Sequence, residues 1–237
     1  MIEQLTGLIG YQFFNNALLA ALLASIACGI IGSYIVIKRM VFISGGITHA
    51  SFGGIGIAYF LGLNPVLGAA VFSILAALGI EWTSIKSNVR EDSAIGILWS
   101  FGMAIGIIFI FMTPGYAPNL MSYLFGSILT VSVTDLWLIG ILAVALIIIF
   151  TAFYHLILFV ACDEEYARSH KAPVNLIKYL MISLVALTIV LNIRLVGIIL
   201  VISFLTIPQS TANIFTKRFN YIIILSIVFG IVGSVGG

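Results

Sequence analysis

The stretch FISGGITHAS, residues 42–51, places a histidine inside an otherwise apolar run. His49 is one of three histidines in the chain, and neutral imidazole is a common ligand for zinc and related metals. Small residues lie three, four or seven positions away on a helix: Gly45, Gly46, Gly53 and Gly56. Such residues admit a neighbouring helix and leave room around the ring. The pattern favours either a cation route or a packing seam that contains a hydrogen-bonded histidine.

A second polar group lies in the stretch SFLTIPQSTAN, which follows an apolar run. Ser203, Thr206 and Ser210 are three or four residues apart and share one helical face. Pro208 has no amide hydrogen and pushes away the carbonyl of Phe204, which predicts a kink. Freed carbonyls are tolerated in a membrane where they are buried or line a cavity. Ser203 and Thr206 are therefore candidate metal ligands, and a plain structural kink is an equal alternative.

The composition places the chain in a membrane. Hydrophobic residues make up 62% of its 237 residues and charged residues only 8%, against about 25% charged in a soluble domain. The mean hydropathy is +1.26, so there is too little polar surface to coat a water-soluble protein. About twenty apolar residues cross a bilayer as a helix. This length predicts an all-α integral membrane protein with eight spans: 13–37, 41–62, 65–83, 93–112, 135–160, 173–192, 195–215 and 219–236.

The basic residues fall in every second predicted loop. Nine of the ten lysines and arginines follow spans one, three, five and seven or just enter span six, and only Arg194 lies on the other side. The positive-inside rule makes the basic side cytoplasmic, which places both ends of this chain outside. On the outer side, the broken segment 119–131 predicts a short interfacial or re-entrant helix.

Loop 161–172, ACDEEYARSHKA, is the most hydrophilic stretch of the chain. Acidic residues at its start and basic residues at its end suit a short helix and its dipole. This helix is either a solvated loop element or a docking helix for a cytoplasmic partner. At the start of span four, Asp92 or Ser93 is placed to cap the helix, and metal binding by Glu91 and Asp92 is the alternative.

Several of these segments together resemble the membrane permeases of ATP-binding-cassette importers for zinc, manganese and related divalent metals. The matching stretches, in order, are KRMVFISGGITHASFGGIGIAYFLGLNP, EDSAIGILWSFGMAIGI, YLFGSILTVSVTDLW, DEEYARSHKAPV and RLVGIILVISFLTIPQSTA. They cover roughly residues 12 to 236. The sequence has no GxxxxGK[ST] phosphate loop, in agreement with an ATPase on a separate subunit.

The resemblance implies one transmembrane permease domain over residues 1–237, with no enzymatic activity of its own. It implies a homodimer surrounded by lipid in a prokaryotic plasma membrane, with an ATP-binding subunit on the cytoplasmic side and a metal-binding protein outside. The substrate would be a zinc, manganese or iron ion; no cofactor would be permanently bound, and the partner would use the ATP. His49 would face the metal route, and the ATPase-coupling helix would contain Asp163, Glu164, Glu165, Tyr166, Ala167, Arg168 and Ser169.

Three departures from the family's pattern matter. Gly45 stands one helical turn before His49, where the family commonly has an aspartate that shares the cation. The two-ligand site therefore does not carry over, and His49 needs other partners: Ser44, Thr48, the hydroxyls of span seven or the same histidine of a second protomer. Lys171 stands where a glycine is usual. Relatives typically continue with one more hydrophobic segment after SVGG, so a C-terminal truncation is one expectation.

Other function classes remain as alternatives. A permease for a metal chelate or vitamin would use the small-residue face only to shape a wide cavity. A secondary carrier would work without ATPase subunits and would be expected to have more acidic residues inside the membrane. A serine hydrolase would need a dyad between helices, because Ser51 lies two residues from His49 on another face. No basic run interleaved with aromatic residues indicates nucleic-acid binding.

Overall fold

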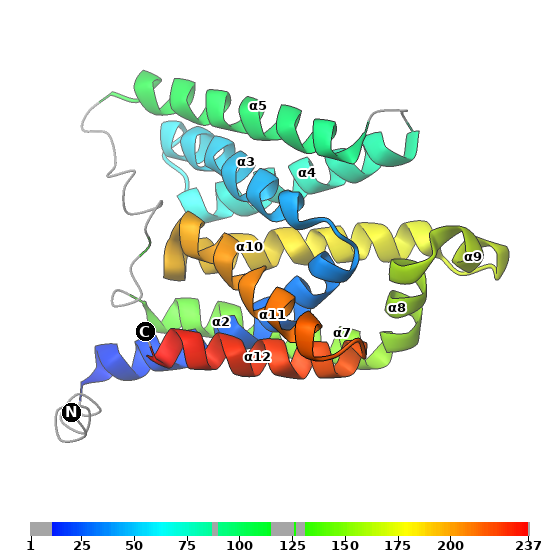
Figure 1. The fold of residues 1–237 in the computed structure, drawn as a ribbon. Coiled ribbons are helices and arrows are strands. Elements are labelled where there is room, and N and C mark those ends of the chain that lie inside the picture. The colour runs from blue at the N-terminus through cyan, green and yellow to red at the C-terminus, as the bar shows by residue number, and fades with distance from the viewer. Residues whose placement is uncertain (1–10, 87–89, 115–125, 127–130, 237) are drawn as a thin grey trace.

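The computed structural model describes residues 11–86, 90–114, 126 and 131–236 (Figure 1). Within them every regular element is a helix, as the composition predicted. The helices are α2 (Gln12–Ile37), α3 (Val41–Phe60), α4 (Pro65–Lys86), α5 (Glu91–Met112), α7 (Val133–Ala152), α8 (Tyr154–Cys162), α9 (Glu164–Ser169), α10 (Val174–Phe204), α11 (Ile207–Phe215) and α12 (Phe219–Gly236).

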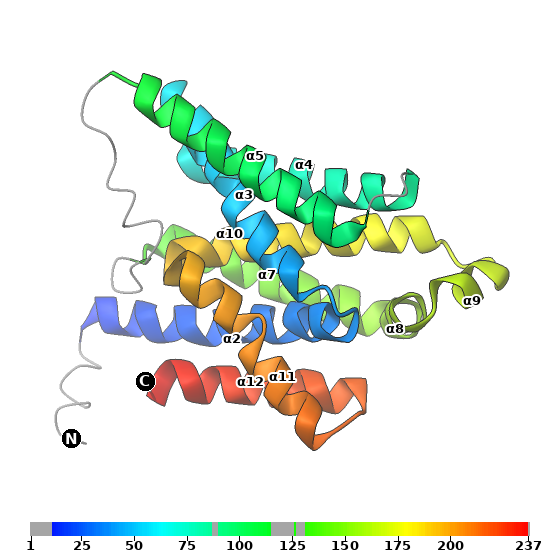
Figure 2. The same cartoon turned by 45° about the horizontal axis from the view of Figure 1, so that its top comes forward.

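Seven helical segments of the described residues are long and apolar enough to cross a membrane. One of them, Val174–Phe215, has 42 residues; as a straight helix it would measure about 63 Å, twice the ~30 Å of a bilayer's hydrocarbon core. Gly197 interrupts it with φ 80° and ψ 169°, a conformation that is essentially restricted to glycine. The chain turns back there (Figures 1 and 2), so this segment supplies two of the predicted spans.

The predicted span 135–160 is two helices in the structure. The helical geometry stops at Phe153 (φ −110°, ψ 19°), between α7 and α8. The Thr151 hydroxyl donates to the carbonyl of Ile147 at 2.7 Å, and such bonds back to the preceding turn often bend helices. The predicted helix over 119–131 lies almost wholly outside the described residues.

The start of α5 also differs from the prediction. Arg90 is the residue before the helix, and its side chain does not cap the first turn. Asp92 and Ser93 are therefore inside that turn instead of before it. Asp92 Oδ2 lies 3.9 Å from Arg90 Nη2 in an exposed ion pair. A negative charge in the first turn is still stabilised by the helix dipole.

Helix α10 is at the centre of the bundle and packs against α2, α3, α4 and α7. On one side of it α3, α4 and α5 form a group, and on the other side α2, α7 and α12 form a second group (Figure 1). Large aliphatic side chains fill the space between the groups, including the fully buried Ile31, Ile47 and Met181. The exposed residues of α5, α7 and α12 are mostly apolar as well, which suits contact with lipid.

Four connections meet at one end of the bundle: α2–α3, α4–α5, α8–α10 and α11–α12 (Figure 1). We call this the basic end, because nine of the ten lysines and arginines lie there. At the opposite end, Arg194 Nη1 lies 2.8 Å from the carboxylate of Asp135. That carboxylate also accepts hydrogen bonds from Ser132, which caps α7.

Candidate functional site

Helix α3 carries His49, and tertiary packing holds it in place. Five glycines in twenty residues give this helix little intrinsic stability, yet most of its residues are buried between α4, α5 and α10. The His49 ring stacks on the Trp99 ring of α5, with centroids 4.3 Å apart and planes 6° from parallel. Its Nδ1 is buried and has no hydrogen-bond partner among the described residues. The ring therefore keeps one nitrogen free for a cation or a proton donor.

The glycines around His49 have two different environments. Gly46, Gly53 and Gly56 lie where α5 approaches most closely: a Cβ at Gly53 would be 2.9 Å from the carbonyl oxygen of Gly102, and one at Gly56 would overlap the backbone of Gly106. Gly46 meets the side chain of Ile95 in the same way. These three glycines form the packing seam between α3 and α5.

Gly45 is not part of that tight seam. A Cβ there would lie 3.6 Å from Trp99 Cζ3 and 4.0 Å from Ile202 Cδ1, which are ordinary contact distances. A Cβ at this position would therefore be accommodated beside the ring on which His49 stacks. The backbone packing does not exclude a side chain here, and this chain has no carboxylate there.

The hydroxyl groups nearest to His49 in sequence are used within α3. Ser44 donates to the carbonyl of Val41 at 2.7 Å, and Thr48 donates to that of Ser44. Ser51 donates to the carbonyl of Thr48 at 2.6 Å. Ser44, Thr48 and Ser51 are completely buried. The structure thus shows no hydrogen bond between His49 and the serines that a hydrolase would need.

The kink predicted in span seven is present, but it lies before Pro208. Helix α10 ends at Phe204 and α11 begins at Ile207, with Pro208 in its first turn, where a missing amide hydrogen costs nothing. The carbonyl of Phe204 accepts a hydrogen bond from Gln209 Nε2 at 3.0 Å. This carbonyl therefore already has a donor within the protein.

The two candidate hydroxyls of this segment bond to their own helix. Thr206 donates to the carbonyl of Ile202 at 2.8 Å, and Ser203 donates to that of Ile199 at 3.3 Å. Both side chains remain partly exposed, and their oxygens keep lone pairs. Ile202 lies beside Gly45, so this segment borders the surroundings of His49.

Gln209 is a structural residue to which the sequence analysis assigned no role. It is completely buried, and its Nε2 also donates to the carbonyl of Cys28 in α2 at 2.8 Å. Gly32 makes room for it, because a Cβ there would be 2.5 Å from Gln209 Nε2. The sequence feature that could have indicated this role is a glutamine one residue after a proline inside an apolar run.

The part of the chain that the structure describes contains no cluster of three or more His, Cys, Asp or Glu side chains that could hold a metal. Among these described residues, His49 therefore does not belong to a closed site of three or more such ligands. Such an arrangement suits brief contact with a passing ion better than permanent binding, because structural metal sites have complete ligand sets.

The loop at the basic end contains the short helix α9. Asp163 caps it by accepting a hydrogen bond from the Tyr166 amide at 2.9 Å. Ala167 is buried, whereas Glu165, Tyr166, Arg168 and Ser169 are exposed. This exposed side of α9 is free to contact another protein.

A chain of four charges fastens α9 to the bundle. Glu164 pairs with Lys38, the residue that follows α2, and with Lys178 of α10, the latter at 3.0 Å. Lys178 also lies 2.7 Å from Glu81 of α4. Burial by itself would raise the pKa of Glu164, but the hydrogen bonds and charges of Lys38 and Lys178 outweigh it and lower that pKa. The sequence placed these residues at one side of the membrane but did not pair them.

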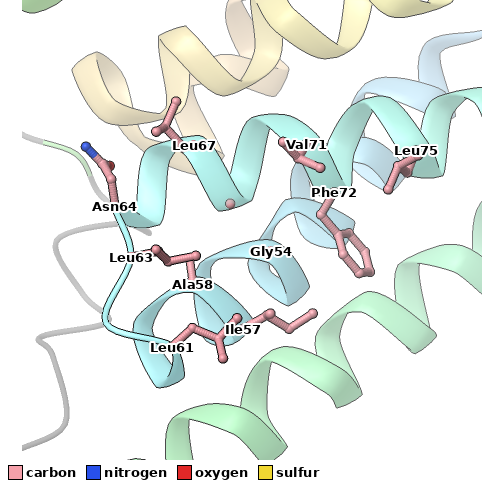
Figure 3. A pocket seen from close by; sticks show the side chains of 11 residues that line it. Gly54, Ile57, Ala58, Leu61, Leu63, Asn64, Leu67, Val71, Phe72 and Leu75 are labelled. Carbon is pink, nitrogen blue, oxygen red and sulfur yellow. The ribbon is translucent and has the colours of Figure 1, made fainter.

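A separate hollow of about 380 Å³ lies between α3 and α4 (Figure 3). Its lining is almost wholly apolar, with Leu67, Val71 and Phe72 among the side chains. Its one polar side chain, Asn64, accepts a hydrogen bond from the Val66 amide at 2.9 Å. The hollow therefore offers nothing to coordinate an ion.

Comparisons with known proteins agree with this architecture. The family model described as ABC 3 transport family matches residues 10–237. An uncharacterized membrane protein of Synechocystis is 45% identical over 217 residues, covering 92% of this chain and 77% of the relative. The manganese transport system membrane protein MntC of Halalkalibacterium halodurans is 36% identical, covering 97% and 79%.

Among solved structures, PsaBC from Streptococcus pneumoniae in complex with a Fab matches with a TM-score of 0.86 and 33% identity. The match covers 99% of this chain and 85% of that one. The helical fold, the family model and these relatives all lead to one assignment. The chain belongs to the ABC 3 transport family, and its resemblance to metal-importer permeases is confirmed.

Proposed function

We propose that this chain is the permease subunit of an ATP-driven importer of a divalent metal ion, with manganese the first candidate substrate and zinc or iron the others. The observation that carries the proposal is the free, buried Nδ1 of His49, held beside Trp99 on a glycine-rich helix. An ionisable side chain at membrane depth usually faces a route for ions or protons. Manganese comes first because related proteins of Halalkalibacterium halodurans and Streptococcus gordonii are named for its transport.

The basic end faces the cytoplasm in this proposal. Its lysines and arginines obey the positive-inside rule, and the surrounding membrane is a prokaryotic plasma membrane. Both ends of the described chain, near Tyr11 and Gly236, then lie on the outer side. A metal-binding protein delivers the ion there, next to the Arg194–Asp135 pair.

Coupling to ATP hydrolysis runs through α9. The partner ATPase docks on the exposed side chains of Glu165, Tyr166 and Arg168. When it moves α9, the paired charges of Glu164, Lys38 and Lys178 oblige α2 and α10 to follow. Breaking these pairs inside the protein would leave a charge without compensation, which is costly. Two such permeases form a homodimer around the route.

The ion is held weakly during passage. His49 supplies one neutral nitrogen, and the hydroxyl oxygens of Ser203 and Thr206 supply further contacts as the helices shift. His49 of the second protomer supplies the remaining ligand of the transported ion. Few ligands suit a transporter, because a closed four-ligand site would retain the ion. With Gly45 in place of the family's usual aspartate, the route has one negative charge fewer per protomer than a route that keeps the aspartate.

The test is ATP-dependent uptake of manganese and zinc into vesicles that contain this chain with its ATPase and its binding protein. His49→Ala should reduce uptake at least tenfold at equal expression. Gly45→Asp should change the manganese-to-zinc ratio, whereas Gly45→Ala, which adds the same Cβ without a charge, should not. Wild-type uptake by His49→Ala would refute the role of His49. Uptake without the ATPase would identify a secondary carrier, and competition by chelated metal alone would identify a chelate importer.

A further inference from the structure

Two hollows adjoin each other in the groove between α7–α8 and α12. One has a volume of about 600 Å³ and lies at the basic end, beside the turn that joins α11 to α12. The other, of about 560 Å³, lies along α7 and α12. Tyr154 and Asn220 line both of them. We call the combined space the α8–α12 groove.

The end of the groove at the basic end is positively charged. Lys217 and Arg218 line it, and no acidic side chain does. Lys217 Nζ donates to the carbonyl of Asn213 at 2.7 Å. Neither cation forms an ion pair with a carboxylate of the described residues, whereas Lys38 and Lys178 both do. No carboxylate of the described residues therefore balances the positive charge of this groove, which favours an anion from outside the chain.

The rest of the groove is mostly apolar, although Thr151 and His155 also line it. Its walls are formed by Ile147 and Phe150 of α7 and by Ile223, Ile224 and Ile227 of α12. From Phe219, the first residue of α12, to Ile227 the helix advances eight residues, which corresponds to about 12 Å, somewhat less than half of the ~30 Å hydrocarbon core. The groove thus runs from one membrane surface to about the middle of the bilayer, the depth that an acyl chain of one leaflet reaches.

We propose that the α8–α12 groove binds an anionic glycerophospholipid of the leaflet at the basic end. Its phosphate lies between Lys217 and Arg218, and an acyl chain lies along Ile224 and Ile227. Tyr154 and Tyr221 stand at the level of the headgroup, where aromatic side chains with a polar tip are favoured. Basic pockets between membrane helices on the cytoplasmic side are suited to anionic headgroups.

Native mass spectrometry of the purified full chain tests this with an equimolar mixture of phosphatidylglycerol and phosphatidylcholine that have identical acyl chains. Among wild-type chains with one bound lipid, the ratio of phosphatidylglycerol to phosphatidylcholine should be about fivefold or more. Lys217→Gln with Arg218→Gln should reduce this ratio to near one. Lys86→Gln with Arg90→Gln removes the same charge from the same end outside the groove and should leave the ratio unchanged.

A second pair of variants separates the groove from surface charge alone. Ile224→Trp places a bulky ring in the apolar part and should reduce the retention of phosphatidylglycerol at least threefold. Ile141→Trp is the control, because Ile141 is an exposed apolar residue of α7 that lines neither hollow. This variant should leave the retention of phosphatidylglycerol unchanged. A wild-type ratio near one, equal losses in the two charge variants, or no effect of Ile224→Trp would each overturn the proposal. No transport is measured, so this outcome is independent of the proposed import function.

Discussion

The rings of His49 and Trp99 lie face to face, with centroids 4.3 Å apart and planes within 6° of parallel. The two residues come from α3 and α5, which the glycine seam brings into close contact. The stack fixes the plane of the imidazole, so that its free Nδ1 has a defined direction. Trp99 therefore contributes to the site although it has no atom suited to binding a metal.

Replacing Trp99 tests whether this stack orients the histidine. Trp99→Phe keeps an aromatic face and should retain most of the metal uptake. Trp99→Leu loses the ring interaction, worth about 0.5–1.5 kcal/mol, and should reduce uptake several-fold. Uptake of manganese in the assembled transporter is the measurement. Phe101→Leu, at an exposed position of the same helix, is the control; an equal loss there would show that only general packing of α5 matters.

The glycine seam predicts different tolerance of a methyl group at neighbouring positions. In Gly56→Ala the new Cβ would overlap the backbone of Gly106. The helices must separate, so we expect the free energy of unfolding to fall by about 1–3 kcal/mol. Gly45→Ala adds the same group where the nearest atom is 3.6 Å away, so it should be neutral or slightly stabilising, because alanine favours the helix over glycine. Thermal unfolding in detergent compares the two, and equal melting temperatures would contradict the seam.

The glycine spacing around His49 correctly indicated a close helix contact, because the size of a glycine and its helical face are local properties. The reversal at Gly197 was harder to locate, because the predicted spans 173–192 and 195–215 put it at residues 193–194, a few residues earlier. In the structure Asn192 donates to the carbonyl of Thr188 at 2.7 Å and remains in the helix. Arg194 reaches Asp135 of α7.

Contacts between distant parts of the chain were beyond sequence reasoning. Lys38, Glu81, Glu164 and Lys178 are spread over 140 residues, and only the fold brings them together. The same holds for Gln209, whose partner Cys28 lies 181 residues away. A hydropathy pattern indicates which segments cross the membrane, but it does not specify which helices become neighbours.

The ion pairs of Glu164 predict how α9 responds to acid. The Lys38 and Lys178 side chains lower the pKa of this carboxyl below its ordinary value of 4.5 when α9 is docked. Since the docked pKa is the lower one, the pairs stabilise docking above pH 4.5, and this stabilisation is lost as the pH falls through the docked value. Hydrogen exchange of the α9 amides should therefore stay slow at pH 5 and accelerate, relative to the intrinsic rate, only in more acidic solution.

Two variants check that Glu164 is the group responsible. Glu164→Gln removes the charge, so α9 should exchange faster at pH 6 and should lose most of the acid response. Glu165→Gln removes a neighbouring exposed charge and should leave both features as in the wild type. An unchanged acid response in Glu164→Gln would assign it to another group.

Lys171 ends α9 in an unfavourable backbone conformation. Its φ is 59°, the left-handed region in which a Cβ costs roughly 1 kcal/mol. Both hydrogen bonds of a Schellman helix C-cap are present. The Ala172 amide donates to the Ala167 carbonyl at 3.1 Å, and the Lys171 amide donates to the Arg168 carbonyl at 3.0 Å. Helices that end with these two hydrogen bonds usually have glycine at this position.

Lys171→Gly should therefore slow hydrogen exchange in α9 by up to about fivefold, somewhat less than the strain alone implies, because glycine also gains freedom in the unfolded chain. Lys171→Ala separates backbone from charge, since it removes the ammonium group but keeps the Cβ. If conformation is the cause, only glycine slows exchange. If both variants slow it equally, the lysine charge opposes α9, and the backbone explanation fails.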